Sequence, residues 1–407
     1  MDPRVYGVDM RLRILNDEVG PVAPAHSGVP WLALGFRPFF LVCSVYAALS
    51  VAIWVATFTG ALSLTTSLPP RLWHAHEMVF GFAAAAIAGF LLTAVPNWTG
   101  YPTPRGPPLG LLVALWGAGR AATFFQSPQV AAILDLAFLP TVGLALAAPL
   151  ARAGKWNNLV FLPVLGALTL ANGLVWAHEL GWRVSAWTGM ELALLSVLML
   201  IVLIAGRVIP FFTRAALPES RSGSSPWLER AATASVPILA LGHLSGFPPF
   251  LLGLLYGLAA LLHAGRIHGW YDRRLWRVPL LWVLFIGYGW LCMGFALRGL
   301  ALLLGGSPFP ALHALTVGCM GMLILGMMSR VALGHTGRPL EPSPWVSLAF
   351  GLLAAAAALR VLGPLLMPAA GLAWIGLSGG LWALAFGTYA VVYLPILTRK
   401  RADGKPG

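Results

Sequence analysis

The chain has 407 residues, of which 58% are hydrophobic and 10% are charged, and it contains 17 tryptophans. A soluble globular domain carries about 25% charged residues, so this composition excludes a chain that folds around one core in water. The formal net charge of +13 is expected to set membrane topology rather than to bind nucleic acid. We therefore predict an all-α fold, a polytopic membrane helix bundle, with no nucleic-acid partner.

Apolar stretches long enough to cross a bilayer recur along most of the chain. A crossing helix needs about 20 residues, and bulky apolar runs without a period of two favour helices over a barrel. The seventh stretch is the weakest because it is short and contains Pro237. We predict about 12 transmembrane helices, over residues 38–60, 72–95, 109–126, 128–150, 158–179, 187–213, 231–245, 249–268, 278–303, 310–334, 345–363 and 370–397.

The basic residues predict the orientation of these crossings. Lysine and arginine are retained on the cytoplasmic side, and of the 26 in the chain all but five fall on one side if both termini are cytoplasmic. The exceptions are Arg71, Arg120, Arg183, Arg298 and Arg360. The predicted organisation is a cytoplasmic segment at 1–37, a twelve-helix domain at 38–397 and a basic cytoplasmic tail at 398–407, which is expected to lie beside anionic lipid.

Groups of helices also repeat along the sequence. Glu191 follows Glu77 by 114 residues, and both stand at the start of an apolar crossing, which places the sixth crossing over the second. Membrane folds are often built from such duplicated groups. We predict three four-helix units, because one crossing later in each unit an ionisable residue recurs at nearly equal separation: Arg120, His243 and Arg360.

Histidines near helix ends make the chain a candidate metal or haem protein. The segment Trp73-His74-Ala75-His76-Glu77 opens the second crossing, and ionisable groups in a membrane are costly unless they have a function. Side chains two residues apart on a helix point about 200° apart, so His74 and His76 cannot both bind one face of a metal. His313 and His335 bracket the tenth crossing about 33 Å apart, which is too far for one metal.

Haem iron takes axial imidazoles, and buried haem propionates pair with arginine. The candidate cofactor-binding residues are His74, His76, His313, Arg120, Arg298 and Arg360. The candidate metal ligands are His74, His76, His178, His243, His313, His335 and Glu77. The alternative for each histidine is a bond to water, backbone or a neighbouring helix, and this interpretation is preferred for His26, His263 and His268. No CxxCH motif occurs, so covalent haem attachment is not expected.

Several motifs resemble the NnrS family of haem- and copper-containing membrane proteins. The first is Leu34-Gly35-Phe36-Arg37-Pro38-Phe39-Phe40, followed by Trp73-His74-Ala75-His76-Glu77-Met78 and Val95-Pro96-Asn97-Trp98-Thr99-Gly100. Later motifs are Gly206-Arg207-Val208-Ile209-Pro210-Phe211-Phe212-Thr213, Ala311-Leu312-His313-Ala314-Leu315-Thr316-Val317-Gly318 and Leu333-Gly334-His335-Thr336-Gly337-Arg338-Pro339. Together these motifs span nearly the whole chain.

The resemblance implies a multi-pass protein of the bacterial cytoplasmic (inner) membrane that binds non-covalent haem b, with copper as a second metal. It also implies a role in the response to nitric oxide during denitrification or nitrosative stress, with nitric oxide and an unidentified electron donor as partners. One alternative is an oxidoreductase that turns over nitric oxide, like the haem-copper nitric oxide reductases. Another is a secondary transporter with a polar outer cavity, which twelve helices with internal repeats also fit. The sequence leaves the oligomeric state open.

Overall fold

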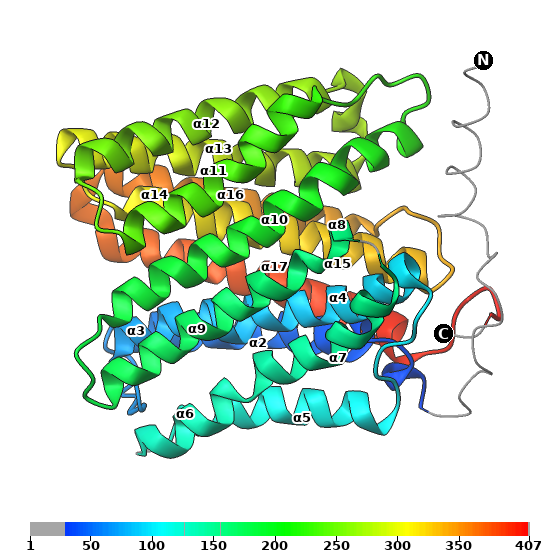
Figure 1. The fold of residues 1–407 in the computed structure, drawn as a ribbon, viewed down its shortest axis with the longest axis horizontal. Helices are drawn as coiled ribbons and strands as arrows, with labels where there is room; N and C mark the ends of the chain where they lie inside the picture. The colour runs from blue at the N-terminus through cyan, green and yellow to red at the C-terminus, as the bar shows by residue number, and fades with distance from the viewer. Residues whose placement is uncertain (1–28, 126, 155, 406–407) are drawn as a thin grey trace.

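The computed structural model describes residues 29–125, 127–154 and 156–405, and all of the regular structure in this part of the chain is helical. The longer helices run roughly parallel or antiparallel to one long axis, horizontal in Figure 1. In chain order the main helices are α2 (Phe36–Phe58), α3 (Pro70–His76), α4 (Ala84–Thr99), α5 (Pro107–Ala122), α6 (Pro128–Leu136), α7 (Phe138–Arg152), α9 (Phe161–Glu179), α10 (Ala186–Ala216), α11 (Pro226–Leu244), α12 (Pro249–Trp270), α13 (Pro279–Leu304), α14 (Phe309–His313), α15 (Met322–His335), α16 (Pro344–Leu366) and α17 (Gly371–Thr398).

Ten helical segments of the described chain are long and apolar enough to cross a membrane. Two of the twelve predicted crossings form helices that fall outside this set. These are α5, which has 16 residues, and α11, which has 19 residues and includes Glu229 and Arg230 in its first turns. The fourth predicted crossing is built from α6 and α7, which together span Pro128–Arg152. The protein is therefore a multi-pass membrane helix bundle.

The exterior of the bundle is apolar along its length. Leucine and valine side chains on several helices are largely exposed, among them Leu144 at 75%, Leu261 at 72% and Val391 at 74%. A soluble protein rarely exposes apolar side chains over so wide an area. These surfaces fit contact with lipid, in agreement with the composition.

The two ends of the bundle differ in what they carry. The end at the left of Figure 1 contains α3 and α14 and is named the α3 end; the opposite end holds residue 405 and is named the C-terminal end. Arg37, at the start of α2, donates hydrogen bonds to the carbonyl oxygens of Leu397 (3.0 Å), in the last turn of α17, and of Arg399 (2.7 Å), directly after it. The described chain therefore starts and finishes at the same end.

Two crossings change their helical pitch close to the α3 end. Between α3 and α4 the chain forms a π-helical segment, η2 (Glu77–Ala83), and between α14 and α15 it forms a second one, η4 (Ala314–Gly321). Such π-helical segments are rare and frequently mark functional sites. Each of these segments starts directly after a histidine, His76 in one crossing and His313 in the other.

The C-terminal residues fold back on the loop after α15. The Ala402 N–H donates to the Thr336 carbonyl (2.9 Å), and Arg401 donates to the His335 carbonyl (3.1 Å). Gly337 has a positive φ of 68°, and a Cβ there would collide with the Asp403 carboxyl group. Hydrogen bonds from the Arg401 guanidinium hold the pKa of that carboxyl well below its usual range. The Gly334 to Pro339 motif thus serves as a docking point for the tail.

Candidate functional site

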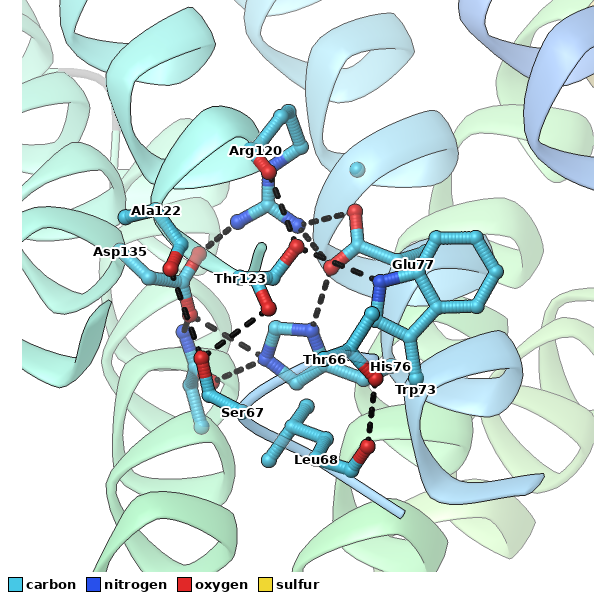
Figure 2. Close-up of polar contacts among 12 residues, drawn as sticks. Thr66, Ser67, Leu68, Trp73, His76, Glu77, Arg120, Ala122, Thr123 and Asp135 are labelled. Carbon is cyan, nitrogen blue, oxygen red and sulfur yellow. Dashed lines mark hydrogen bonds and ion pairs between the residues drawn. The ribbon is translucent and has the colours of Figure 1, made fainter. Parts of the chain in front are cut away.

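His76 lies at the centre of a buried polar cluster near the α3 end (Figure 2). Its Nδ1 lies 2.9 Å from Glu77 Oε1, and its Nε2 lies 2.9 Å from Asn172 Oδ1 and 3.1 Å from Asp135 Oδ2. His76 and Glu77 have no exposed surface. Both ring nitrogens therefore already have partners inside the protein.

Arg120 joins the two carboxylates of this cluster. Its Nη1 donates to both Glu77 oxygens at 2.8 Å, and its Nη2 forms an ion pair with Asp135. α5 supplies the arginine, η2 supplies Glu77 and α6 supplies Asp135, so one guanidinium connects three segments. An ion pair in so buried a place is favourable only when its remaining hydrogen bonds are satisfied, and here nearly all of them are.

Three further side chains complete the cluster, and the sequence analysis did not identify them. Tyr46 of α2 donates a hydrogen bond to Glu77. Asn172 and Trp176 of α9 each donate to Asp135 Oδ2 at 2.8 Å. The position of Asn172 inside an apolar crossing was a signal of this cluster in the sequence, because a buried side-chain amide requires hydrogen-bond partners.

The connection between α2 and α3 covers the cluster on the side of the α3 end. Ser67 hydrogen-bonds to the carbonyl of Thr123, and Trp73 donates from its indole nitrogen to the Thr123 hydroxyl at 3.2 Å (Figure 2). Gly81 allows the close approach of α2, since a Cβ there would lie 2.5 Å from Tyr46 Cε1. The cluster is thus closed by local packing on more than one side.

His74 lies in a different environment, although it is only two residues from His76. Its ring stacks on Trp54 of α2, with ring centres 4.6 Å apart and planes 6° from parallel. Its Nδ1 is buried and has no hydrogen-bond partner among the described residues. A buried nitrogen without a partner is costly, so this atom indicates a place for a ligand.

His313 and Arg360 are the neighbours of His74 from distant parts of the sequence. The positive charge of Arg360 on α16 acts on both imidazoles, and His74 and His313 also interact with each other electrostatically. His313 Nδ1 lies 2.7 Å from the Phe309 carbonyl oxygen. This bond requires a proton on Nδ1, so the lone pair lies on Nε2, which is the arrangement common to metal-binding histidines.

His243 belongs to a third group, formed by α10 to α13. Its Nε2 lies 3.0 Å from the Tyr256 hydroxyl and 3.3 Å from Glu191 Oε1. Arg298 approaches the same carboxylate at 3.6 Å. Tyr256 donates to Glu191 at 3.1 Å, so His243 and Arg298 share one partly exposed carboxylate.

His178 lies apart from these groups, at the end of α9. Its Nδ1 lies 2.8 Å from the Val184 carbonyl oxygen. It lines a cleft of about 580 Å³ at the α3 end, together with other polar and aromatic side chains that include Trp54, Arg71, Glu179 and Trp187. Since Trp54 also stacks on His74, this cleft adjoins the group formed by His74, His313 and Arg360.

His335 lies at the opposite end of the bundle, as expected from its distance along the helix. Its ring packs on Phe36 with centres 5.7 Å apart. The structure thus divides the predicted site residues into three groups at or near the α3 end, with His178 beside the group of His74 and His335 remote. Among the described residues no three histidine, cysteine, aspartate or glutamate side chains are arranged to hold a metal ion.

One further buried cluster joins α11, α12 and α13. His263 Nδ1 lies 2.7 Å from the Tyr288 hydroxyl, which also accepts from Arg266 Nη1 at 2.8 Å. Arg266 in turn pairs with Glu229 of α11 at 2.6 Å. His263 has no exposed surface and Arg266 is 2% exposed. For His263 the sequence favours a bond to water, backbone or a neighbouring helix, and Tyr288 of α13 confirms this, but the partners of His263 and Arg266 were not identified. Their partners lie on other helices and leave no mark in the local pattern.

Comparison with known proteins shows the family of this chain. The family model described as NnrS protein matches residues 30–401, which is nearly the whole chain. No curated protein matches the chain. The match extends over every helix from α2 to α17 and includes the three histidine groups. On this evidence the chain belongs to the NnrS family.

Proposed function

We propose that this protein binds a b-type haem between His74 and His313 and acts in the cellular response to nitric oxide. The observation that carries the proposal is that His74 Nδ1 is buried without a partner among the described residues, while His313 of the tenth crossing keeps its Nε2 lone pair and lies on α14, which packs against the helix of Arg360, α16. Two imidazoles on opposite faces are a standard haem ligand set, and arginine pairs with propionate. This donor set fits haem.

Several of the predicted cofactor residues already have partners inside the protein. His76 is engaged at both nitrogens and Arg120 is held by two carboxylates, so neither is free to bind a cofactor. Arg298 is already directed at Glu191. Copper stays a prediction, and the proposal concerns haem, with Arg360 as its propionate partner.

Haem iron in the ferrous state binds nitric oxide at an axial position. Of the two proposed ligands, His313 is oriented by its bond to the Phe309 carbonyl, whereas no hydrogen bond to another described residue orients the ring of His74. Ligands held by a second hydrogen bond bind metal more firmly. We expect His74 to be the ligand that nitric oxide displaces, and the cleft beside Trp54 to be the opening nearest to it.

The membrane arrangement that we propose has twelve crossings in three four-helix units, with both termini in the cytoplasm and the α3 end facing the outside of a bacterial inner membrane. The unequal distribution of basic residues supports the orientation. Pairs at matching positions support the repeat: Glu77 with Arg120 (2.8 Å) and Glu191 with His243 (3.3 Å). Each pair joins two consecutive crossings.

The proposal is tested by the haem content and absorption spectrum of the purified protein and its variants. We expect one haem band in the wild type that is lost or shifted in both His74→Ala and His313→Ala. His178→Ala is the matched control, since its ring bonds to a loop carbonyl at the same end, and it should keep the wild-type spectrum. A colourless wild type from haem-replete cells, or unchanged spectra in both ligand variants, would overturn the proposal.

Binding and turnover of nitric oxide are separated by one further assay. Anaerobic nitric oxide is added to the reduced protein in the presence of excess reductant, and its loss is followed with time. Uptake that stops at one equivalent per haem identifies a binding protein. Consumption that continues while reductant lasts identifies an oxidoreductase of the nitric oxide reductase type, supplied in the cell by an electron donor.

A further inference from the structure

The group around His243 brings together three atoms of the kinds that bind metal ions. They are His243 Nε2 on α11, the Tyr256 hydroxyl on α12 and Glu191 Oε1 on α10. The nitrogen lies 3.0 Å from the hydroxyl and 3.3 Å from the carboxylate oxygen, and the two oxygens are 3.1 Å apart. Three helices thus supply one donor atom each to a small triangle, which is named the donor triangle.

The size of the donor triangle matches the spacing of ligands around one metal ion. Zinc binds imidazole nitrogen and carboxylate oxygen at about 2.1 Å. Two ligand atoms at that distance lie about 3.0 Å apart when they form a right angle at the ion, and about 3.4 Å apart at the tetrahedral angle. The three observed separations fall within this range. An ion just outside the plane of the donor triangle can therefore reach all three atoms.

Hydrogen bonds alone do not account for the three contacts of the donor triangle. Tyr256 has one hydroxyl proton, which it donates to Glu191. His243 Nε2 carries at most one proton, and an ionised carboxylate only accepts. The three contacts therefore share at most two protons. A cation in their place would contact a lone pair of every atom in the donor triangle.

The buried cluster around Glu77 contains the same four residue types but is closed to an ion. There Arg120 donates to both oxygens of Glu77, which has no exposed surface. Arg298 instead approaches Glu191 Oε2, the oxygen outside the donor triangle, at 3.6 Å. The side chains of His243 and Glu191 retain 19% and 24% of their exposure. An ion can therefore enter the donor triangle, and water can complete its coordination.

We propose that Glu191, His243 and Tyr256 form a binding site for a divalent transition-metal ion, and that zinc is the ion it takes. One imidazole and two oxygens without sulfur suit zinc rather than cuprous copper. The described residues hold no metal-binding set of three histidine, cysteine, aspartate or glutamate side chains, and here the third ligand is a tyrosine. On binding, the Tyr256 hydroxyl releases its proton to solvent, so that phenolate and carboxylate balance the charge of the ion.

The direct test is the position of zinc in crystals of the full chain soaked with a zinc salt. Anomalous data collected on both sides of the zinc absorption edge separate zinc from any haem iron. We expect a zinc peak in contact with His243, Glu191 and Tyr256. A donor triangle without zinc, or zinc only at other positions, would overturn the proposal.

Three variants each remove one donor atom: His243→Ala, Glu191→Gln and Tyr256→Phe. Each should weaken zinc binding in equilibrium dialysis by at least about tenfold, since even residues that only orient a metal ligand contribute that much. The matched controls, each of which changes an exposed residue outside the donor triangle, are His268→Ala, Glu341→Gln and Tyr101→Phe. They should bind zinc like the wild type, and equal affinity in all six variants would contradict the site.

Tyr256→Phe is the most conservative of the three variants. It keeps the ring that packs on Phe295, with centres 5.8 Å apart, and removes only the hydroxyl. It therefore tests the site even if the other two variants fail to fold. Zinc binding as tight as in the wild type would overturn the three-ligand site.

The metal site uses none of the residues of the haem proposal, so the two are tested separately. Zinc in the donor triangle of a protein that proves to lack haem would support the metal site and remove the proposed function. A haem protein with no zinc in the donor triangle would do the reverse.

Discussion

His74 and His76 are separated by two residues and belong to two different parts of the molecule. His76 is held by Glu77, Asp135 and Asn172 in a closed cluster. His74 points elsewhere, stacks on Trp54 and keeps a buried nitrogen without a hydrogen bond among the described residues. The same residue type in one motif therefore has two roles, which are set by the direction in which each side chain leaves the helix.

The two groups differ in whether their polar atoms have hydrogen-bond and ion-pair partners inside the protein. The cluster around His76 balances one guanidinium against two carboxylates and uses its hydrogen bonds internally. A network of this kind stabilises the fold, and Arg120 Nε is its one buried side-chain atom without a partner among the described residues. The group of His74, His313 and Arg360 forms no ion pair with a carboxylate among the described residues, and His74 Nδ1 is buried there without a partner.

The largest expected effect comes from removing Arg120. Arg120→Ala leaves Glu77 and Asp135 buried without their counter-charge, and breaking a buried pair in this way costs about 3–5 kcal/mol. Arg360→Ala is the comparison, because no carboxylate depends on it, and we expect a cost within about 1 kcal/mol. Thermal unfolding in detergent measures both. Equal destabilisation of the two variants would show that the distinction between the groups is mistaken.

A smaller effect is expected for the tyrosine of the same cluster. Tyr46→Phe removes the hydroxyl that donates to Glu77, and a hydrogen bond to a charged group contributes about 1.5–3 kcal/mol. Tyr101→Phe, at an exposed position, should change the stability by less than about 0.5 kcal/mol. Denaturant titration of the three proteins gives the two differences. The interpretation fails if Tyr46→Phe is as stable as the wild type.

Gly81 tests the packing that closes the cluster. Gly81→Ala places a methyl group against the Tyr46 ring and close to Glu77, and overpacking of this kind costs about 1–3 kcal/mol. Gly117→Ala on α5 meets open space and should instead stabilise its helix by up to about 1 kcal/mol. We predict that Gly81→Ala lowers the melting temperature and that Gly117→Ala raises it. A higher melting temperature in Gly81→Ala would contradict the close contact with Tyr46.

The smallest effect concerns the partly exposed pair of Arg298 and Glu191. Their charged atoms are 3.6 Å apart and both side chains retain more than 20% of their exposure, so solvent screens the interaction. Arg298→Ala should cost less than about 1 kcal/mol. It should also leave the haem spectrum unchanged, since Arg298 is absent from the proposed haem group. Loss of haem in this variant would return Arg298 to the list of cofactor residues.

The membrane fold was predictable because the composition and the length of each apolar run are visible in the local sequence. Ten crossings follow from apolar runs that the bilayer requires. The α5 and α11 helices were also expected, although their shortness and their charges separate them from the other ten. The π-helical segments after His76 and His313 were not foreseen, because no residue pattern in the sequence analysis distinguishes them from a regular helix.

The site was predictable in part. The sequence analysis named His74, His313 and Arg360 among its candidates, but it did not separate them from His76, Arg120 and His243. His74 and His76 point about 200° apart, and the neighbours that each one faces depend on how α3 is rotated relative to α2, α9 and α16. The sequence of the motif does not specify that rotation. For the same reason the partners Tyr46 and Asn172 were missed, and Tyr288 was not identified as the partner of His263.

The central claim is that His74 ligates haem and His76 does not, and the spectrum of the ferric protein with and without added imidazole tests it most directly. The proposal predicts that His74→Ala loses the low-spin spectrum of two-histidine ligation and regains it when imidazole is added, while His76→Gln keeps the wild-type spectrum in the protein that folds. A wild-type spectrum in His74→Ala, with the loss and the imidazole rescue in His76→Gln, would contradict it.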